Sequence, residues 1–486
     1  MEPSHLIAID LGTSAFRVSI FDSRGVSIFL KKIKLTNQTI STWLEALSRI
    51  SPKEALANVS PNNIHMSICG TSGTIVPVDE FGTPMMEPIM YFERAPSVEV
   101  TKICALEAAK ELSKKGVPIS ATSPISKLLH RKKSNPSLFH QVRWIFSPTT
   151  WLLYRLHIPE GKMWDNVATD WTNGLKFGVN ISPEVPVWYR PIFEQSGLPL
   201  ELMPDLVPCG SPIGVAQSQL AERLGLAGVN LYQGMTDGTA TALITGCLQP
   251  GSMGLSVGTT STLKYACQEM RASSAIYYHK HPLGGYLAGA APVTGAMLSW
   301  FVEKILRTSM EDAVALAEQI MPGSELLFLP QGDREPFFAN QMGAAFFGLW
   351  PRNDSPETAR GTFVRSIMLG IAMAENALIR IIEELFDSST DAIGITGGGT
   401  RNATWNRIRA SVYEKTLKII DTPMTMGPLI PVILNIGLCK DINELEEKML
   451  HSKEEIYPDT RLVSQYKEQK MSFMKKWAFL KQFYDF

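Results

Sequence analysis

Asp237 is the first residue of this chain whose type and setting could carry chemistry. It lies in the segment 234–240 (GMTDGTA), between an apolar, strand-like run at 229–232 and a helical pattern that extends to Gly246. A carboxylate at the start of a helix is electrostatically favourable, so one interpretation is an N-cap. The other is a general base, because phosphoryl transfer needs a carboxylate that orients the attacking hydroxyl and accepts its proton. The residues around Asp237 leave both interpretations open.

A glycine-threonine turn near the N-terminus could hold phosphate groups. In the segment 10–14 (DLGTS), Gly12 lets the backbone approach a phosphate closely, and the backbone N–H groups and hydroxyls of Thr13 and Ser14 can donate to it. Asp10 could hold a hydrated Mg²⁺. The chain contains neither G-x-x-x-x-G-K-[ST] nor G-x-G-x-x-G, so a phosphate site must use other turns of this kind.

A second turn, 256–261 (SVGTTS), repeats these donors but carries Ser256 where the first turn has Asp10. When the two turns are aligned, apolar runs superimpose on both sides, which predicts two homologous halves. A third glycine-rich turn, 397–399, follows a strand pattern at 392–396. Two phosphate turns and one metal carboxylate would suit a single MgATP.

The turns are embedded in an α/β pattern. Apolar residues at helical spacing predict a long helix over 363–386, and a shorter helix is expected from about 402 to 413, directly after the third turn. The tail, 456–486, reads as one amphipathic helix whose lysines form a solvated face. Strand, glycine-rich turn and helix in this order are typical of a nucleotide site.

The length of 486 residues exceeds what one hydrophobic core usually supports, so we expect two domains, 1–247 and 248–486. A formal net charge of -1 gives no electrostatic argument for nucleic acid or a membrane surface and favours a small-molecule partner. The sequence does not set the oligomeric state, and a homodimer is one expectation.

The cysteines predict a reducing compartment. All six are scattered, without a C-x-x-C pair or metal-ligand spacing. The N-terminus enters a strand pattern at once, and no later apolar run reaches the length expected of a membrane span. We therefore expect a cytoplasmic protein.

These motifs together resemble the FGGY family of carbohydrate kinases, within the larger actin-like ATPase superfamily. The resemblance runs from about Leu6 to at least Asn402. The segments 9–14 and 251–261 resemble the two phosphate signatures of the family, and 396–402 resembles its adenosine motif. The resemblance implies two actin-like (ribonuclease H-like) ATPase domains with a cleft between them.

The resemblance also implies roles for individual residues in an ATP-dependent sugar kinase. Asp237 falls on the catalytic base, and Asp10 would hold Mg²⁺ through water. The residues assigned to ATP are Gly12, Thr13, Ser14, Arg17, Gly258, Thr259, Thr260, Gly398, Gly399 and Asn402.

Two loops bear on the sugar. The loop 69–74 (CGTSGT) has neither the Gln-x-His pattern of xylulokinases nor the Arg-Glu pair of glycerol kinases, and with the segments 90–95 and 169–176 it looks more like the ribulokinase-like branch first described as xylulose kinases. The implied acceptor is the terminal hydroxyl of a ketopentose, D-ribulose before D-xylulose. The residues assigned to the sugar are Thr71, Ser72, Arg94 and Asp237. Turn chemistry for Thr71 and Ser72, and a surface ion pair of Arg94 with Glu93, are the competing interpretations.

The chain departs from the family pattern in places. Arg334 and Glu335 stand in exchanged order, Glu93 is an uncertain stand-in for a family carboxylate, and 422–428 (TPMTMGP) replaces an acidic segment that opens a helix beside the adenosine motif. Its two prolines should break the first helical turn. A catalytically silent nucleotide-binding scaffold therefore stays an alternative, as does a kinase of another sugar or polyol. An actin-like polyphosphatase or chaperone ATPase would leave Asp237 unexplained.

Overall fold

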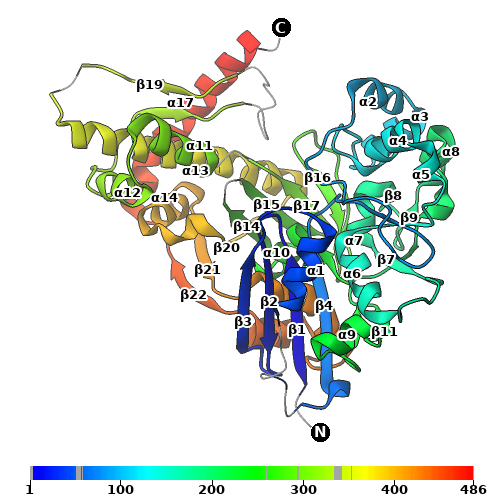
Figure 1. Ribbon diagram of the computed structural model, residues 1–486. Coiled ribbons are helices and arrows are strands. Elements are labelled where there is room, and N and C mark those ends of the chain that lie inside the picture. Colours follow the sequence, from blue (N-terminus) through cyan, green and yellow to red (C-terminus); the bar gives the residue numbers. More distant parts are fainter. Residues whose placement is uncertain are drawn as a thin grey trace. The chain divides into compact units, whose positions relative to one another are not determined.

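The computed structural model describes residues 4–50, 56, 59–258, 260–292, 295–332, 342–351 and 353–484 (Figure 1). Its contacts divide the chain into two compact units, each described here by itself. Unit 1 comprises Met1–Ile244, Tyr278–Tyr286 and Thr422–His451, and unit 2 comprises Thr245–Tyr277, Leu287–Asp421 and Ser452–Phe486. The predicted domains, 1–247 and 248–486, are two continuous ranges, whereas each compact unit consists of three separate segments because the chain returns to unit 1 twice. The boundary at 247/248 stays a prediction.

Unit 1 is built on a mixed sheet with the strand order β11-β12-β4-β1-β2-β3, in which β13 also pairs with β4. Its strands are β1 (His5–Leu11), β2 (Ala15–Phe21), β3 (Ser27–Lys34), β4 (Ile64–Gly70), β11 (Pro212–Val215), β12 (Asn230–Tyr232) and β13 (Met235–Thr236). β1 pairs antiparallel with β2 and parallel with β4. Nearly every residue of β1, β2 and β4 is buried, as expected for strands covered on both faces.

Helices cover this sheet and extend unit 1 beyond it. They are α1 (Ile40–Ser48), α2 (Ser97–Cys104), α3 (Glu107–Lys114), α4 (Pro124–Ser134), α5 (Pro136–Phe139), α6 (Pro148–His157), α7 (Trp171–Gly174), α8 (Arg190–Ser196), α9 (Gln219–Leu224), α10 (Asp237–Ile244), α15 (Ile430–Asn435) and α16 (Ile442–Met449). Short ribbons join β5 (Val76–Val78) to β6 (Trp144–Phe146), β7 (Ala168–Asp170) to β10 (Asp205–Val207), and β8 (Val179–Asn180) to β9 (Val187–Trp188). Trp43 of α1 and Trp151 of α6 are almost completely buried and belong to the core around β1 and β4.

Unit 2 repeats the sheet of unit 1. Its strands are β14 (Met253–Val257), β15 (Ser261–Cys267), β17 (Tyr286–Ala290), β20 (Ala392–Thr396), β21 (Thr416–Ile420) and β22 (Ser452–Ile456), with the order β17-β15-β14-β20-β21-β22. From Tyr278 on, β16 (Tyr277–Lys280) falls in the stretch that belongs to unit 1. β14 pairs antiparallel with β15 and parallel with β20, as β1 does with β2 and β4. The aligned turns predicted from the sequence thus occupy the same place in two sheets of equal order.

The helices of unit 2 are α11 (Gly295–Trp300), α12 (Met310–Glu318), α13 (Pro356–Phe386), α14 (Ala403–Tyr413) and α17 (Thr460–Tyr484), and a ribbon joins β18 (Leu327–Leu329) to β19 (Ala345–Phe347). The tail helix begins at Thr460 rather than near 456, because 452–456 forms β22. The predicted helix at 402–413 is α14, which Asn402 caps.

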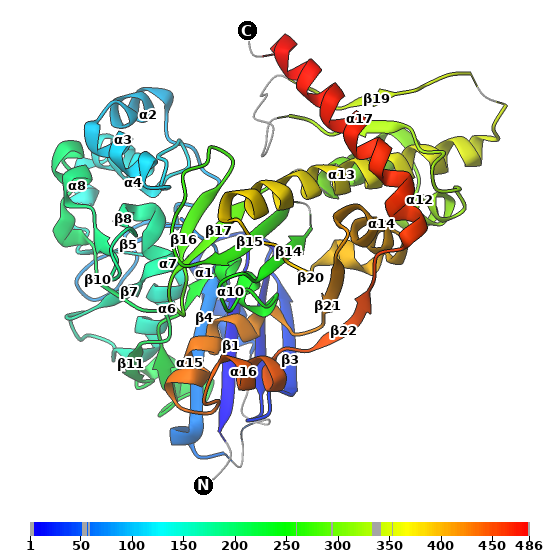
Figure 2. The ribbon, with the colours of Figure 1, turned by 180° about the vertical axis from the view of Figure 1, so that it is seen from behind.

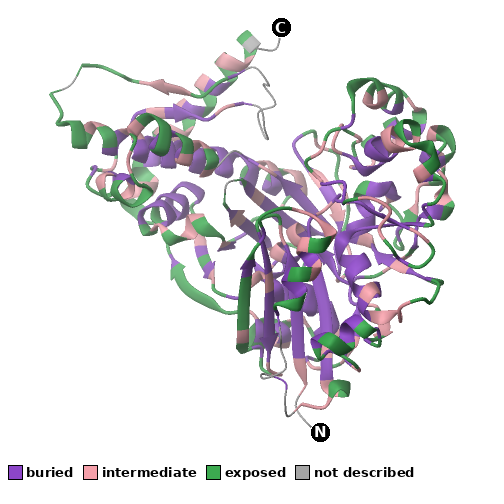
Figure 3. Ribbon diagram, viewed as in Figure 1, coloured by how far each residue is buried: buried purple, intermediate pink, exposed green. Residues whose placement is uncertain are grey.

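α13 corrects one expectation from the sequence. Within the described residues it is the helix long and apolar enough to cross a membrane, whereas the sequence predicted no such run. However, 89% of its most apolar 18-residue window is buried inside the fold. Figure 3 shows this burial along much of the helix. The apolar composition of α13 is therefore explained by its contacts within unit 2.

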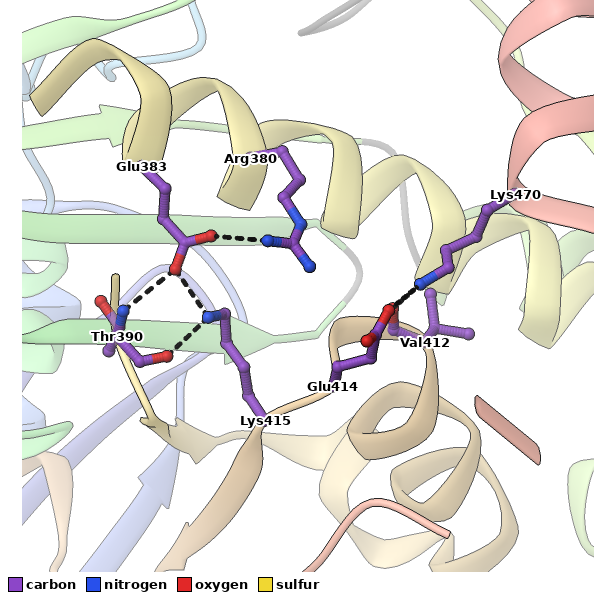
Figure 4. Close-up of polar contacts among 7 residues, drawn as sticks. All are labelled: Arg380, Glu383, Thr390, Val412, Glu414, Lys415 and Lys470. Atoms are coloured by element: carbon purple, nitrogen blue, oxygen red, sulfur yellow. Dashed lines mark hydrogen bonds and ion pairs between the residues drawn. The ribbon is translucent and has the colours of Figure 1, made fainter. Parts of the chain in front are cut away.

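Polar contacts fix α13 to the strands beside it (Figure 4). The carboxylate of Glu383 accepts from Lys415 Nζ at 2.6 Å and from Thr390 N at 3.0 Å, and Arg380 Nη1 lies 3.4 Å from its other oxygen. Both Lys415 and Glu383 are buried. Because Thr390 precedes β20 and Lys415 precedes β21, the C-terminal end of α13 holds the start of both strands.

Candidate active site

The first glycine-threonine turn joins β1 to β2 in unit 1. Gly12 N donates to Ala15 O at 3.1 Å, which closes the turn and leaves the side chains of Thr13 and Ser14 exposed. Asp10 lies in β1, two residues before Gly12, and is completely buried. Arg17 Nη1 donates to its Oδ2 at 2.5 Å. The exposed donors and the buried carboxylate therefore lie at one end of β1.

The ionised form of Asp10 is disfavoured by its burial. Burial raises its pKa to about 6; the Arg17 guanidinium lowers the pKa and the charge of Asp237 raises it. The parallel pairing of β1 with β4 sets Asp10 beside Cys69, and β13, which ends one residue before Asp237, pairs with β4 at the same level. Sheet register thus brings Asp10 and Asp237, 227 positions apart in sequence, to one edge.

Asp237 is the first residue of α10, and its Oδ1 accepts from Gly238 N at 2.7 Å. An N-cap lies before the helix and accepts from its second or third amide, so the N-cap interpretation does not describe this bond. Within the described part of the chain Asp237 Oδ2 has no hydrogen-bond partner, although the side chain is only partly exposed. Burial raises the pKa of Asp237, the Gly238 amide lowers it, and the charge of Lys176 lowers it further. One oxygen of the carboxylate is therefore available to a ligand.

Lys176 is the last residue of the segment 169–176, and the sequence predicted no role for it individually. The protein around its ammonium group lowers its pKa, while the charge of Asp237 acts in the opposite direction. Gly73, at φ +86°, permits its close approach, because a Cβ there would lie 3.2 Å from Lys176 Cδ. Because Lys176 lies 61 positions before Asp237, the residues around Asp237 in the sequence could not indicate that this lysine influences it.

The predicted sugar loop 69–74 lies next to Lys176 through Gly73. Thr71 is buried, and its hydroxyl lies 2.9 Å from that of Thr74, whereas Ser72 is half-buried. Thr71 is therefore held in a turn and Ser72 is the more accessible of the two hydroxyls.

Arg94 is exposed, and among the described residues no hydrogen bond or ion pair places it beside that loop. The competing pair with Glu93 is not formed: Glu93 Oε2 lies 3.4 Å from Arg131 Nη2, and Glu93 Oε1 accepts from Met90 N at 2.8 Å. Arg94 is consequently free to contact a ligand or solvent.

A buried aspartate supports the strand that leads to Asp237. Asp170 Oδ1 accepts from the hydroxyl of Thr172 at 2.6 Å and from Asn173 N at 3.0 Å, which caps α7. Thr172 Oγ1 in turn accepts from Thr236 N at 3.0 Å. These two hydrogen bonds, from Thr172 to Asp170 and from Thr236 to Thr172, fix the residue before Asp237 and do not involve the carboxylate of Asp237.

The second glycine-threonine turn belongs to unit 2. Gly258 N donates to Thr260 O at 3.1 Å, and Thr260 is exposed. Behind the turn, the buried Ser261 hydroxyl donates to Glu375 Oε1 at 3.1 Å. Thr259, assigned to ATP, lies outside the described residues, as do Arg334 and Glu335.

The third turn packs directly on the second. Gly397 has φ +105°, and a Cβ there would meet Val257 O at 2.4 Å, so the backbones of β14 and this turn touch. Gly398 faces open space, and Asn402 Oδ1 accepts from Trp405 N at 2.9 Å. Unit 2 therefore brings Gly258, Thr260, Gly398, Gly399 and Asn402 to one edge of its sheet, and Asn402 caps α14. Their assignment to ATP stays a prediction.

The segment 422–428 belongs to unit 1, where residues Met424–Leu429 form a 3-10 helix. A Cβ on Gly427 would lie 2.5 Å from Ala240 O of α10, and Thr425 Oγ1 lies 2.6 Å from Ser19 Oγ of β2. Figure 2 shows the helices α15 and α16 that follow this segment. The α-helix α15 begins only at Ile430, after both prolines of the segment, and the segment itself packs against the helix that starts at Asp237.

Comparisons with known proteins agree with this arrangement. The model of the FGGY family of carbohydrate kinases, N-terminal domain, matches residues 5–244, and that of its C-terminal domain matches residues 253–427. A xylulose kinase of Bacillus subtilis (strain 168) is 22% identical over 488 residues, covering 95% of this chain and 94% of the relative. A gluconokinase of Bacillus licheniformis is 19% identical, covering 86% and 84% of the two chains.

A crystal structure of xylulose kinase from Rhodospirillum rubrum superimposes with a TM-score of 0.83 at 18% identity and covers 99% of this chain and 100% of that one. The two-domain α/β fold predicted from the motifs is confirmed, and the xylulose-kinase-like branch is supported. The named relatives act on different sugars, so the family alone does not define the acceptor. The chain belongs to the FGGY family of carbohydrate kinases, phosphotransferases with an alcohol group as acceptor.

Proposed function

We propose that this kinase transfers the γ-phosphoryl group of ATP to the terminal hydroxyl of a ketopentose, with D-ribulose preferred over D-xylulose. The observation that carries the proposal is Asp237, whose Oδ2 has no hydrogen-bond partner among the described residues and whose pKa is raised by burial. A raised pKa brings the carboxylate closer to the proton affinity that a general base needs at neutral pH. The loop 69–74, which lacks the Gln-x-His pattern, supports ribulose, and the names of several relatives support xylulose as the next choice.

In this mechanism Asp237 Oδ2 accepts a hydrogen bond from the sugar hydroxyl and takes its proton as the bond to phosphorus forms. Lys176 would contact the sugar or the transferred phosphoryl group, and Ser72 and Arg94 would contact other hydroxyls of the sugar. Thr13, Ser14 and Arg17 would donate to the phosphates from the first turn. Thr260, the glycine turn and Asn402 would bind the nucleotide in unit 2.

Asp10 fits a hydrated Mg²⁺. Within the described residues no cluster of three or more His, Cys, Asp or Glu side chains could hold a metal ion. A single buried carboxylate is nevertheless what Mg²⁺ uses when phosphates and water fill its other positions. Burial raises the pKa of Asp10 to about 6 despite the Arg17 guanidinium, and a nearby cation would favour the ionised form. When bound, the ion would neutralise charge on the phosphates.

The test is a coupled assay of ADP formation with purified protein over a panel of pentuloses, hexuloses and polyols. We expect D-ribulose to give the highest kcat/KM, and Asp237→Asn to lower kcat by about 10²- to 10⁴-fold, the range of a positioned general base. Asp205→Asn, at an exposed carboxylate of unit 1, is the matched control. Turnover that survives Asp237→Asn would exclude the assigned base.

A catalytically silent scaffold stays the second candidate because of the altered segment 422–428. Its signature is nucleotide binding by calorimetry without sugar-stimulated turnover on any member of the panel.

All six cysteines are free thiols, which supports the proposed cytoplasmic location. A homodimer, and the absence of nucleic acid or membrane partners, stay predictions that light scattering and binding assays would test.

A further inference from the structure

A buried lysine of unit 1 has no place in the mechanism above. Lys127 lies on α4 and is 3% exposed. Its Nζ donates to Gly73 O at 3.0 Å and to Met90 O at 2.8 Å. Gly73 belongs to the loop 69–74 and Met90 to the loop 90–95, the two loops assigned to the sugar. One ammonium group therefore ties both loops to a helix.

Burying an ammonium group is costly unless its donors are used. Here two of the three donors are matched by neutral carbonyls, and the charge of Glu93 lies nearby but makes no ion pair with Lys127. Burial accordingly lowers the pKa of Lys127 to about 8; Glu93 acts to raise it and Lys176 to lower it. Gly73 O and Met90 O are themselves in buried residues and would lose these donors without the lysine.

The two loops already contact each other near Lys127. Ile75 N donates to Ile89 O and Ile89 N donates to Ile75 O, both at 3.0 Å, and Tyr91 N donates to Thr74 Oγ1 at 3.2 Å. These bonds join the two loops to one another, two of them through the flanking residues Ile75 and Ile89.

The loop 90–95 has other contacts with unit 1, since Ala95 N donates to Ala121 O at 2.8 Å and Glu93 Oε2 lies 3.4 Å from Arg131 Nη2 of α4, and residues 69–70 belong to β4. Among the described residues, Lys127 is the side chain outside the loops that bonds to both of them.

The anchored loops reach the other functional residues. Gly73 is in close contact with the side chain of Lys176, whose pKa the charge of Asp237 acts to raise. The hydroxyl of Thr13, in the first phosphate turn, donates to Tyr91 OH at 3.3 Å. A shift of the Gly73 and Met90 carbonyls would therefore move groups around the sugar before it moved the glycine turns of unit 2.

We propose that Lys127 is a positioning residue that holds the loops 69–74 and 90–95 as one rigid surface for the sugar, acting through the two carbonyls and not by touching the substrate. The inference rests on the proposed function for its sugar readout only. Its mechanical part, the anchoring of the loops, can be measured without any substrate.

The experiment compares Lys127→Met with Lys132→Met in the full-length protein. Lys132 is the matched control, because it lies on the same helix and its Nζ also donates to a main-chain carbonyl, Gly197 O at 2.5 Å, away from the loops. Losing hydrogen bonds from a charged donor should raise the sugar KM of Lys127→Met by about tenfold or more. The ATP KM should stay within about twofold of the wild type, the scale of a negligible change in binding free energy.

Hydrogen exchange of the unliganded protein supplies the second readout. Amides of residues 71–75 and 89–93 should exchange faster in Lys127→Met, and as in the wild type in Lys132→Met. Should Lys127→Met not fold, Lys127→Gln, which keeps one N–H donor group, should show the same changes at smaller size.

An unchanged sugar KM together with unchanged exchange overturns the proposal. So does a loss in which both KM values, kcat and exchange throughout unit 1 change together, since that is general destabilisation. If the wild type phosphorylates no sugar on the panel, the proposed function fails, and local exchange at the two loops still decides whether Lys127 anchors them.

Discussion

The two glycine-threonine turns occupy matching places in two sheets, but they differ in charge and, by one residue, in the hydrogen bond that closes them. In each, an antiparallel hairpin is closed by a short N–H to carbonyl bond, Gly12 to Ala15 in unit 1 and Gly258 to Thr260 in unit 2, both at 3.1 Å. Register sets Asp10 opposite Arg17 in the first hairpin and Ser256 opposite Thr262 in the second. The first turn thus carries an ion pair beside the proposed phosphate donors, whereas the second offers neutral groups.

In unit 2 the charges stand behind the turn instead. Glu375 of α13 accepts from the Ser261 hydroxyl, from Arg409 Nε at 3.0 Å and from Tyr413 OH at 2.5 Å, and all four residues are buried. Arg409 also lies over the ring of Trp405, 4.0 Å from its centroid. The same kind of hairpin therefore has two different electrostatic settings. In unit 1 the carboxylate of Asp10 lies at the turn, where it is available to a cation. In unit 2 the carboxylate of Glu375 lies behind the turn, where it positions the hydroxyl of Ser261.

The largest expected effect is on the stability of unit 2. Glu375→Gln leaves the fully buried Arg409 without a counter-charge, and breaking a buried pair in this way costs about 3–5 kcal/mol. Glu375→Leu combined with Arg409→Leu, Ser261→Ala and Tyr413→Phe should recover most of that loss, because the charges and the two hydroxyls that bond to Glu375 are then removed together. Urea unfolding followed by fluorescence measures both variants. A combined variant no more stable than Glu375→Gln would show that the unpaired charge of Arg409 is not the cause of the loss.

In unit 1 we expect a substitution of Asp10 to lower activity without lowering stability. Asp10→Asn should lower kcat on the order of 10²-fold, as removal of a preorganised electrostatic group does. It should not lower thermal stability, because burial already disfavours the charge of Asp10, whose pKa is about 6. Ser256→Ala, the equivalent change in unit 2, should alter kcat less than about threefold. Equal losses in the two variants would remove the distinction between the turns.

Local sequence was sufficient for the parts of the site that depend on neighbouring residues. The turns at Gly12 and Gly258, the glycine turn before α14 and the start of α10 at Asp237 all follow from turn and helix-start signals within a few positions. The internal repeat also predicted that the two hairpins occupy matching sites.

What local sequence could not supply is the set of long-range partners. Glu375 meets Ser261 across 114 positions, and Lys127 meets Gly73 across 54. The same holds for Lys176 beside Asp237, and for 422–428, whose place against α10 depends on the chain returning to unit 1. Such partners are selected by sheet register and helix packing, so no periodicity or spacing in one segment reveals them.

The smallest expected effect contrasts the glycines of the two sheets. At Gly397 a Cβ would lie 2.4 Å from Val257 O and the backbone is at φ +105°, so Gly397→Ala must both strain and displace the strand pair β14–β20. At Gly12, where φ is not positive, a Cβ would lie 3.1 Å from Ala15 O and 3.4 Å from the side chain of Arg17, which can move. We expect Gly397→Ala to lower the free energy of unfolding by about 1–3 kcal/mol, the range for a strained backbone position, and Gly12→Ala to lower it by less.

Thermal unfolding of both variants, with and without ATP, tests this contrast. The strain at Gly397 acts on the backbone of the turn 397–399, for which we propose a role in nucleotide binding, so its alanine variant should also lose most of the stabilisation that ATP gives. Gly12→Ala should keep most of it if the nucleotide is bound mainly by unit 2. A greater loss of ATP stabilisation at Gly12 than at Gly397 would reverse that assignment and make the charged turn of unit 1 the principal nucleotide contact.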